Sequence, residues 1–352
     1  MGSRPVSASG DPPFSEENIA PITVSVIVPC YNERETIHLL LDALYAQTFP
    51  HGEMEVVVAD GMSTDGTRDA IAFWAAEHPD LTVRVVENPE RVIPAALNAA
   101  LRAARGEFIV RVDAHSMPAP DYVARSIENL RAGRGENVGG IWRIQPGAAG
   151  WVARSIAAAA AHPLGVGGAS YRVGGEPQAV DTVPFGAFRK KLVEQIGCYD
   201  ETLLSNEDYE YNARIRKAGG TVWFDPQIQS VYFARATFGA LARQYWRYGY
   251  WKWRMLRRYP ETVRWRQGLP PLFVLSLLTL GLLAFWMPWA RALFAVEVGV
   301  YALILLAAGA HASWRRRDAA LLIGLPIAIA VMHLTWGAAF LWSLMTGLLR
   351  QS

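Results

Sequence analysis

Asp113 and His115 are the first residues whose types and spacing suggest chemistry. They follow an apolar, β-branched run that begins at Phe108, a pattern typical of a buried strand. On an extended chain, residues two positions apart point to the same side. A carboxylate oxygen and an imidazole nitrogen on one side suit a divalent cation such as Mn²⁺ or Mg²⁺. The alternative is that Asp113 only caps a turn, helped by Pro118 and Pro120.

Glu207 and Asp208 form a second group of acids, directly before a predicted helix over residues 209–218. Acids at the start of a helix stabilise its dipole, so one interpretation is purely structural. The other is catalytic, because a carboxylate can take a proton from a hydroxyl nucleophile during group transfer. Asp181 lies in a predicted strand and turn, where it either contacts a sugar hydroxyl or caps the turn.

Strands and helices alternate through the first third of the chain, which predicts an α/β fold with a mostly parallel, doubly wound sheet. Asn32 is expected to cap the first helix, which begins near Glu33. Two predicted strands end in aspartate, at Asp60 and Asp113, so both carboxylates should face one crevice at the sheet edge. The predicted strands cover residues 24–29, 55–60, 82–86 and a run from 108, with helices over 33–44, 69–77 and 94–104 between them.

Composition and missing motifs exclude several classes of protein. No G-x-G-x-x-G follows the first strand and no G-x-x-x-x-G-K-[ST] occurs, which argues against dinucleotide-binding and P-loop folds. The formal net charge of +2 gives no global attraction to nucleic acid, so no nucleic-acid partner is expected. Cys30 and Cys198 form neither a disulfide framework nor a metal motif, and they indicate a reducing compartment.

Three ordered motifs carry a resemblance to a known family. Residues 24–33, Val-Ser-Val-Ile-Val-Pro-Cys-Tyr-Asn-Glu, resemble the opening signature of the family 2 glycosyltransferases, which have the GT-A fold. Residues 60–67 resemble the second motif of that family, and residues 113–115 fall where the family has its D-x-D metal motif. The resemblance covers about residues 22 to 260. The chain looks most like bacterial succinoglycan-type exopolysaccharide glucosyltransferases with C-terminal membrane spans.

The resemblance implies roles for individual residues. Asp208 takes the place of the catalytic base, with Glu207 as a positioning acid. His115 takes a metal-ligand place beside Asp113, where the family usually has an aspartate. The nucleotide sugar is expected to contact Pro29, Tyr31 and Glu33 of the first motif. Asp60 is expected to bind its nucleobase and Asp113 its ribose, and Gln244 and Arg247 belong to a Q-x-x-R-W-like motif that also contacts the donor. The acceptor is expected at Asp181 and Arg243.

A basic and aromatic segment follows this region, from Arg235 to Arg266. Four arginines recur at intervals of four, seven and four residues, which places them on one stripe of a helix. Such a helix would lie at a membrane surface, with its rings among the headgroups and its cations toward anionic lipid. The four are Arg243, Arg247, Arg254 and Arg258.

Three long apolar segments complete the chain. Residues 269–287 and 292–312 are each long enough to cross a bilayer. Residues 319–349 are too many for one straight crossing, so this segment either tilts or breaks near Pro326. Arginines concentrate before the first segment and after the second, whereas the turn between them holds only Arg291. Positive-inside counting therefore places the catalytic domain in the cytoplasm and the C-terminus outside.

These segments divide the chain into four predicted parts. They are a disordered leader over residues 1–20, a GT-A domain over 21–235, basic aromatic interfacial helices over 236–268 and a transmembrane region over 269–352.

The expected activity is inverting, metal-dependent transfer of a hexose, with UDP-glucose as the first candidate donor. The expected acceptor is a lipid-linked saccharide in exopolysaccharide or cell-surface glycan synthesis, at the plasma membrane of a bacterium. Direct transfer to polyprenyl phosphate is one alternative. A non-catalytic nucleotide-sugar sensor is another, favoured by the unusual His115 but opposed by the presence of Asp113 and Asp208. Other glycan-assembly enzymes are further candidate partners.

Overall fold

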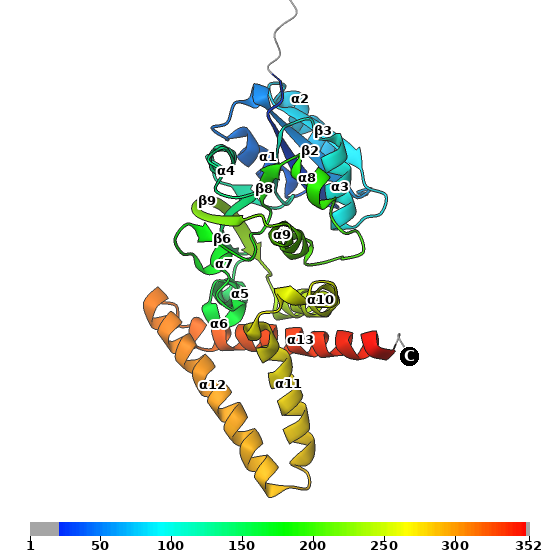
Figure 1. The fold of residues 1–352 in the computed structure, drawn as a ribbon. Helices are drawn as coiled ribbons and strands as arrows, with labels where there is room; N and C mark the ends of the chain where they lie inside the picture. The colour runs from blue at the N-terminus through cyan, green and yellow to red at the C-terminus, as the bar shows by residue number, and fades with distance from the viewer. Residues whose placement is uncertain (1–20, 350–352) are drawn as a thin grey trace, which may run out of the picture.

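A mixed α/β domain is followed by three long apolar helices (Figure 1). The structure, a computed structural model, describes residues 21–349. The leader predicted over residues 1–20 lies outside the described residues.

Four parallel strands form the first half of the sheet, in the order β3-β2-β1-β4. They are β1 (Val24–Cys30), β2 (Met54–Asp60), β3 (Thr82–Glu87) and β4 (Phe108–Arg111). Strands β1, β2 and β4 are short, largely apolar and almost fully buried, whereas β3 at the edge of the sheet is partly exposed. Cys30 pairs with Asp60 in register, so the carboxyl ends of β1 and β2 lie level with each other. This arrangement confirms the predicted doubly wound α/β fold.

The second half of the sheet is mixed and continues in the order β8-β6-β9-β5. Strand β8 is antiparallel to both β4 and β6, whereas β6 and β9 are parallel. The short strands β5 and β7 pair with β9 in antiparallel fashion. These strands are β5 (Met117–Pro118), β6 (Asn137–Pro146), β7 (Gln178–Ala179), β8 (Ala187–Arg189) and β9 (Val222–Ala234).

Helices cover both faces of the sheet, and each face has its own apolar core. One core joins the sheet to α1 (Ile37–Tyr45), α2 (Thr67–Glu77) and α4 (Tyr122–Arg131). The other joins it to α3 (Ile93–Ala103), α8 (Leu192–Ile196) and α9 (Glu207–Lys217). The remaining elements of the domain are η1 (His51–Glu53), α5 (Trp151–Ala160), α6 (Pro163–Val166), α7 (Ser170–Val173), α10 (Phe238–Arg258) and η2 (Pro260–Thr262).

Two local predictions about the site loops are wrong. Asn32 does not cap the first helix, because it adopts a left-handed conformation (φ 53°) and α1 begins at Ile37 with Thr36 as its N-cap. The strand after Phe108 ends at Arg111, and the peptide N–H and hydroxyl of Ser116 both bond the Asp113 carbonyl to close a turn. Asp113 and His115 therefore lie in a turn and not on an extended strand.

The last three helices are each long and apolar enough to cross a membrane. They are α11 (Trp265–Leu283), α12 (Pro288–Arg316) and α13 (Leu321–Leu349). Helices α11 and α12 form a hairpin that points away from the domain (Figure 1). Helix α13 is continuous through Pro326, so the predicted break at that residue is absent.

Helix α13 lies along the domain instead of extending beside the hairpin (Figure 1). A methyl group on Gly324 would lie 2.0 Å from the Ser155 hydroxyl of α5, and one on Gly249 of α10 would lie 2.2 Å from the Trp336 carbonyl. Near the far end, Gly347 is within 4 Å of Trp253 of α10. Because contacts with the domain extend over most of α13, both of its ends lie on the domain side of the hairpin. This packing favours a C-terminus on the domain side of the membrane, whereas our prediction from the positive-inside rule places it on the opposite side.

We predict that the C-terminus and the catalytic domain lie on the same side of the membrane. The reason is that α11 and α12 cross out and back while α13 stays against α5 and α10. The measurement is protease digestion of a C-terminal epitope tag in sealed vesicles of both orientations, with the catalytic domain probed in the same samples.

An epitope tag inserted between Ala284 and Met287, in the turn of the hairpin, is the matched control and should show the opposite accessibility. A C-terminal tag that is digested only when the catalytic domain is protected would contradict the packing of α13.

Candidate active site

The loops after β1 and β2 interlock to form the first wall of the site. The peptide N–H of Asn32 donates to the Ser63 hydroxyl (2.8 Å), and the Asn32 side-chain oxygen accepts from Thr64 N–H (2.9 Å). Thr67 accepts from the peptide N–H of Glu33 at 2.9 Å. These bonds require the polar residues of both predicted motifs, which explains why the two segments carry them.

Asp60 is fully buried at the end of β2. Its carboxylate accepts hydrogen bonds from the Ser63 peptide N–H (3.1 Å) and hydroxyl, and it forms an ion pair with Arg68. These partners belong to the turn that opens α2, so in this structure Asp60 shapes its own loop. A nucleobase contact at Asp60 stays a prediction.

Glu33 links this wall to the turn after β4. Its carboxylate lies 3.0 Å from Nδ1 of His115, while Tyr31 is exposed and Pro29 half-buried nearby. The hydrogen bond with Glu33 raises the pKa of His115 more than burial lowers it. Burial tends to raise the pKa of Glu33, but hydrogen bonds from His115 and Thr36 outweigh it and the net shift is downward. The pair therefore favours a charged imidazole, which must lose its proton before it can bind a metal ion.

Arg111 is the centre of the site and is almost fully buried. Its Nη2 lies 3.1 Å from Glu207 Oε1 and 3.3 Å from Asp113 Oδ1, and its Nη1 forms an ion pair with Asp208. Burial opposes the charged guanidinium, but the charges of Asp113 and Glu207 outweigh it and raise the pKa of Arg111. One cation thus joins the end of β4 to the first turn of α9. The structure brings the three predicted acids together through a residue that the sequence analysis had not assigned to the site.

A pattern in the sequence could have identified Arg111. It is the one charged residue in the apolar run Phe108–Val112, where a buried cation is costly unless acids surround it. Acids at strand ends were considered for the site, whereas Arg111 is a cation and was not assigned to it.

Asp113 and His115 offer a divalent cation two protein ligands. Their side chains are 26% and 39% exposed and lie on one turn. Among residues 21–349, no group of three or more His, Cys, Asp or Glu side chains is arranged so that it could hold a metal ion by itself. A carboxylate oxygen and an imidazole nitrogen fit Mn²⁺ or Mg²⁺ when substrate phosphates supply further ligands. Metal binding by these two residues stays a prediction.

Helix α9 begins at Glu207, two residues before the predicted start. Hydrogen bonds of three of its side chains, Asp208, Glu210 and Asn212, join it to the rest of the domain. Glu210 is buried and accepts from Arg214 (2.6 Å) and from the Tyr259 hydroxyl (2.6 Å). Asn212 bonds the Val183 carbonyl at 3.0 Å, and Phe185 N–H lies 3.4 Å from Asp208 Oδ2. These bonds fix the first turn of the helix, and with it the two acids.

Asp181 and the predicted site residues of α10 lie outside the Arg111 cluster, and their contacts with substrate stay predictions. Asp181 contacts the Tyr209 hydroxyl (3.4 Å) and lies near two arginines at the start of α11. Gln244 is buried and donates to the hydroxyls of Tyr232 and Tyr248, at 3.0 Å each. Arg243 and Arg247 are exposed on the same helix.

Two of the four arginines in the predicted stripe contact protein groups. Arg258 forms an ion pair with Asp200, on the loop before α9. Arg254 lies over the rings of Tyr250 and Trp251, with its guanidinium carbon 4.6 and 5.3 Å from their centroids. The spacing of the arginines alone does not reveal these partners, and contact of the stripe with lipid stays a prediction.

Comparisons with known proteins give the same fold and related activities. The family profile described as "Glycosyl transferase family 2" matches residues 25–197. The succinoglycan biosynthesis protein ExoA of Rhizobium meliloti (strain 1021) is 30% identical over 93% of this chain and 96% of that protein. The structure of the mannosyltransferase PcManGT from Pyrobaculum calidifontis, in complex with GDP-Man and Mn²⁺, has a TM-score of 0.56 and 27% identity over 90% of each chain.

A third relative is an archaeal enzyme with a lipid-linked substrate in its name. The dolichyl N-acetyl-alpha-D-glucosaminyl phosphate 3-beta-D-2,3-diacetamido-2,3-dideoxy-beta-D-glucuronosyltransferase of Methanococcus voltae is 28% identical over 74% of this chain and 83% of that protein. The fold and the carboxylate site thus define a glycosyltransferase with a GT-A fold. Within this class, the chain belongs to glycosyl transferase family 2.

Lys252 of α10 is a buried cation beside the site. Its Nζ lies 3.2 Å from the centroid of the Tyr209 ring and 3.7 Å from the Met255 sulfur. Burial lowers the pKa of Lys252 to about 7, with Arg216 and Arg266 adding to the effect and Asp181 opposing it. The structure therefore holds this amine close to its titration point at neutral pH.

We predict that Lys252→Met raises the free energy of unfolding at pH 7 relative to wild type. The difference between the variant and wild type should shrink as the pH rises toward 10. The pKa is lower in the folded protein than the usual value of about 10.4, so between these values the unfolded chain binds more protons. Wild-type stability should therefore rise with pH, by up to about 1.4 kcal/mol per pH unit, relative to the variant. Thermal unfolding in detergent from pH 7 to 10 measures this difference.

Lys191→Met is the matched control, because Lys191 is exposed to solvent in the folded protein as it is in the unfolded chain. Its replacement should therefore leave the dependence of stability on pH unchanged. Parallel pH profiles for wild type and Lys252→Met would show that Lys252 is not a buried titrating group.

Proposed function

We propose that this glycosyltransferase transfers a hexose, with inversion, from a nucleoside diphosphate sugar to a lipid-linked saccharide. The observation that carries the proposal is the cluster of Asp113, Glu207 and Asp208 around Arg111, at the carboxyl end of the sheet. The names of the relatives support the setting: one belongs to succinoglycan biosynthesis and another acts on a dolichyl-linked sugar.

In the proposed reaction, Asp208 takes the proton of the acceptor hydroxyl as that oxygen attacks the anomeric carbon. A single displacement inverts the anomeric configuration and releases the nucleoside diphosphate, so no covalent enzyme nucleophile is needed. Glu207 and Asp113 share Arg111 with Asp208, which fixes the direction of the base. Arg111 is thus a positioning residue in this mechanism.

Asp113 and His115 would hold a divalent cation, Mn²⁺ or Mg²⁺, which would neutralise charge on the leaving diphosphate. The relative solved with GDP-Man and Mn²⁺ supports a cation of this kind. The same relative makes GDP-sugars candidate donors beside UDP-glucose, so both nucleotide classes belong in the first assay.

The proposed location is the plasma membrane of a bacterium, with the catalytic domain in the cytoplasm. Three helices could span a membrane. Arginines lie at the domain end of the hairpin, in segments 254–266 and 315–317, whereas the turn at its far end holds Arg291 alone. The positive-inside rule places the arginine-rich end in the cytoplasm.

The experiment that tests the function is nucleotide release from UDP- and GDP-sugars, with and without Mn²⁺, by the full-length protein in detergent. Membrane lipid extract, a prenyl phosphate and water are the alternative acceptors. Release that requires lipid-linked saccharide supports the proposal, and release that requires only prenyl phosphate supports direct transfer to the carrier. Binding of nucleotide without release under all conditions would indicate a sensor.

We predict that Asp208→Asn lowers the transfer rate by about 10²–10⁴-fold, because a general base acts only in the transition state. Donor affinity, measured by isothermal titration with the nucleoside diphosphate, should stay within about twofold of wild type. Asp121→Asn is the matched control, since Asp121 also pairs with an arginine, Arg125, but lies outside the site. A transfer rate above about a tenth of wild type would remove Asp208 from the role of base.

We predict that Arg111→Met destabilises the fold by about 3–5 kcal/mol, because three acids then share a buried region with no cation. Arg111→Lys should retain most of the stability, because it keeps the charge. It should nevertheless lower kcat by about tenfold or more with little change in the KM for donor, because an ammonium cannot bond three carboxylates in the fork geometry of a guanidinium. Thermal unfolding and transfer kinetics of both variants provide the measurements.

A lysine variant with wild-type kcat would show that Arg111 supplies charge alone. Wild-type stability of the methionine variant would show that the acids do not depend on Arg111.

A further inference from the structure

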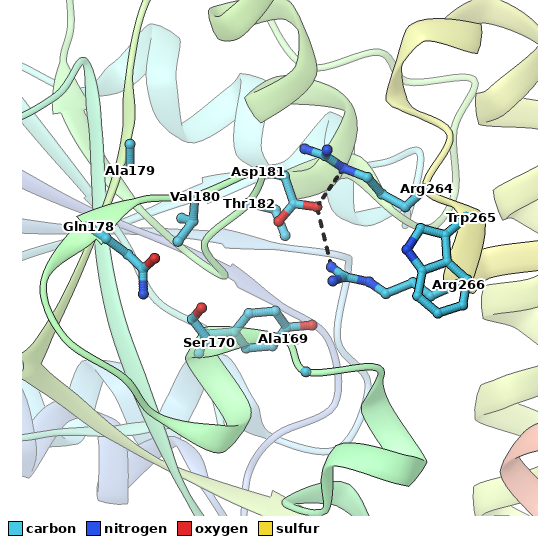
Figure 2. Close-up of a pocket in the computed structure, with 12 residues that line it drawn as sticks. Ala169, Ser170, Gln178, Ala179, Val180, Asp181, Thr182, Arg264, Trp265 and Arg266 are labelled. Carbon is cyan, nitrogen blue, oxygen red and sulfur yellow. Dashed lines mark ion pairs between the residues drawn. The ribbon is translucent and has the colours of Figure 1, made fainter.

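A cavity lies between the catalytic domain and the first apolar helix, apart from the acid cluster (Figure 2). Its volume is about 310 Å³, and its walls are segments 168–171 and 178–182 and the start of α11. In Figure 2, the side chains of Arg264 and Arg266 point toward Asp181 across this space. Residues of the first two family motifs do not line it.

The charges around the cavity are not balanced within the described part of the chain. Arg264 Nε and Arg266 Nη2 lie 3.5 and 3.7 Å from the same Asp181 oxygen. Both distances exceed the 2.7–2.9 Å of a strong charge-assisted hydrogen bond. The cavity wall thus holds two guanidinium groups against one carboxylate, which favours an anionic ligand.

The cavity opens onto an apolar surface. Trp265, on its wall, is 80% exposed, and Leu269 and Leu272 continue as exposed side chains along α11. Tryptophan is favoured at the boundary between membrane and water, and an exposed apolar helix of this length favours lipid. A ligand that fits both surfaces has an anionic head and an apolar tail.

The cavity also adjoins the acid cluster. The segment from Asp181 to Phe185 begins in the cavity wall and ends where Phe185 N–H faces the Asp208 carboxylate, 3.4 Å away. Four residue steps cover at most about 14 Å of chain. A sugar attached to a head group in the cavity therefore lies within reach of Asp208.

We propose that this cavity binds the diphosphate of a prenyl-type lipid carrier, with Arg264 and Arg266 as its ligands and the prenyl chain along α11. The proposal rests on the proposed function, in which the acceptor is lipid-linked, and it assigns the acceptor head group to named residues. Free diphosphate and the diphosphate of the donor share the same chemistry. The donor is disfavoured because the residues proposed to contact the nucleotide sugar lie at the ends of β1 and β2, after β4 and on α10, and none of them lines the cavity.

The test is a set of binding measurements on the full-length protein in detergent, which need no turnover. The probes are farnesyl diphosphate for head and tail, inorganic diphosphate for the head alone, and UDP and GDP for the donor. We expect the double variant Arg264→Gln/Arg266→Gln to bind farnesyl diphosphate at least about tenfold more weakly, because two charge-assisted contacts are lost. Binding of UDP or GDP should stay within about twofold of wild type. Wild type should bind inorganic diphosphate more weakly than farnesyl diphosphate.

Two further variants act as controls. Asp181→Asn should bind farnesyl diphosphate more tightly, because it removes the negative charge that holds both arginines, and a misfolded protein would not gain affinity. Arg315→Gln/Arg316→Gln removes two positive charges at the end of α12, as many as the Arg264/Arg266 variant removes at the cavity. This variant should bind all of the probes as wild type does.

The outcomes separate this proposal from the function itself. Unchanged farnesyl diphosphate binding in the Arg264/Arg266 variant overturns the proposal, even if the protein transfers sugar to lipid. Loss of UDP or GDP binding in that variant also overturns it and assigns the cavity to the donor. Equal affinity of wild type for inorganic and farnesyl diphosphate would overturn the lipid assignment in favour of a free anion. Normal lipid diphosphate binding with no nucleotide release would support the cavity and count against the proposed function.

Discussion

The ion-pair cluster around Arg111 is the constraint on which the rest of the site depends. A buried guanidinium is stable only when acids surround it, and buried acids are stable only when a cation joins them. Arg111 and Asp208 are 97 residues apart, so their pairing joins the parallel half of the sheet to the helix that carries the acid pair. Chemistry and folding are therefore coupled at this point.

The two halves of the site differ in what holds them. The loops after β1 and β2 are joined by hydrogen bonds among short polar side chains, such as those of Asn32 and Ser63. Helix α9 is held by buried side chains that reach across the domain, including Glu210 to Tyr259, which follows α10. Because Tyr259 leads into α11, the acid pair and the membrane helices share one support. This connection gives a physical route by which a membrane-bound substrate could be presented to the acids.

The position of α13 further couples the domain to the membrane-facing elements. Its close contacts with α5 and α10 use glycines, at Gly249 and Gly324, where any side chain would collide with the opposing helix. An apolar helix packed so tightly covers the underside of the domain and leaves its other face for lipid. The catalytic domain is thereby held directly against the membrane surface in the proposed arrangement.

The sequence by itself determined the features that depend on neighbours along the chain. The alternation of strands and helices, the aspartates at Asp60 and Asp113, and the apolar segments follow from local periodicity and composition. Only the tertiary structure decided which distant groups meet. Examples are Arg111 with Asp208, and Arg258 with Asp200. The course of α13 along the domain and the cavity at Arg264 also belong to this class. The physical reason is that a residue's partner depends on packing between elements, whereas periodicity reports only which face of an element is buried.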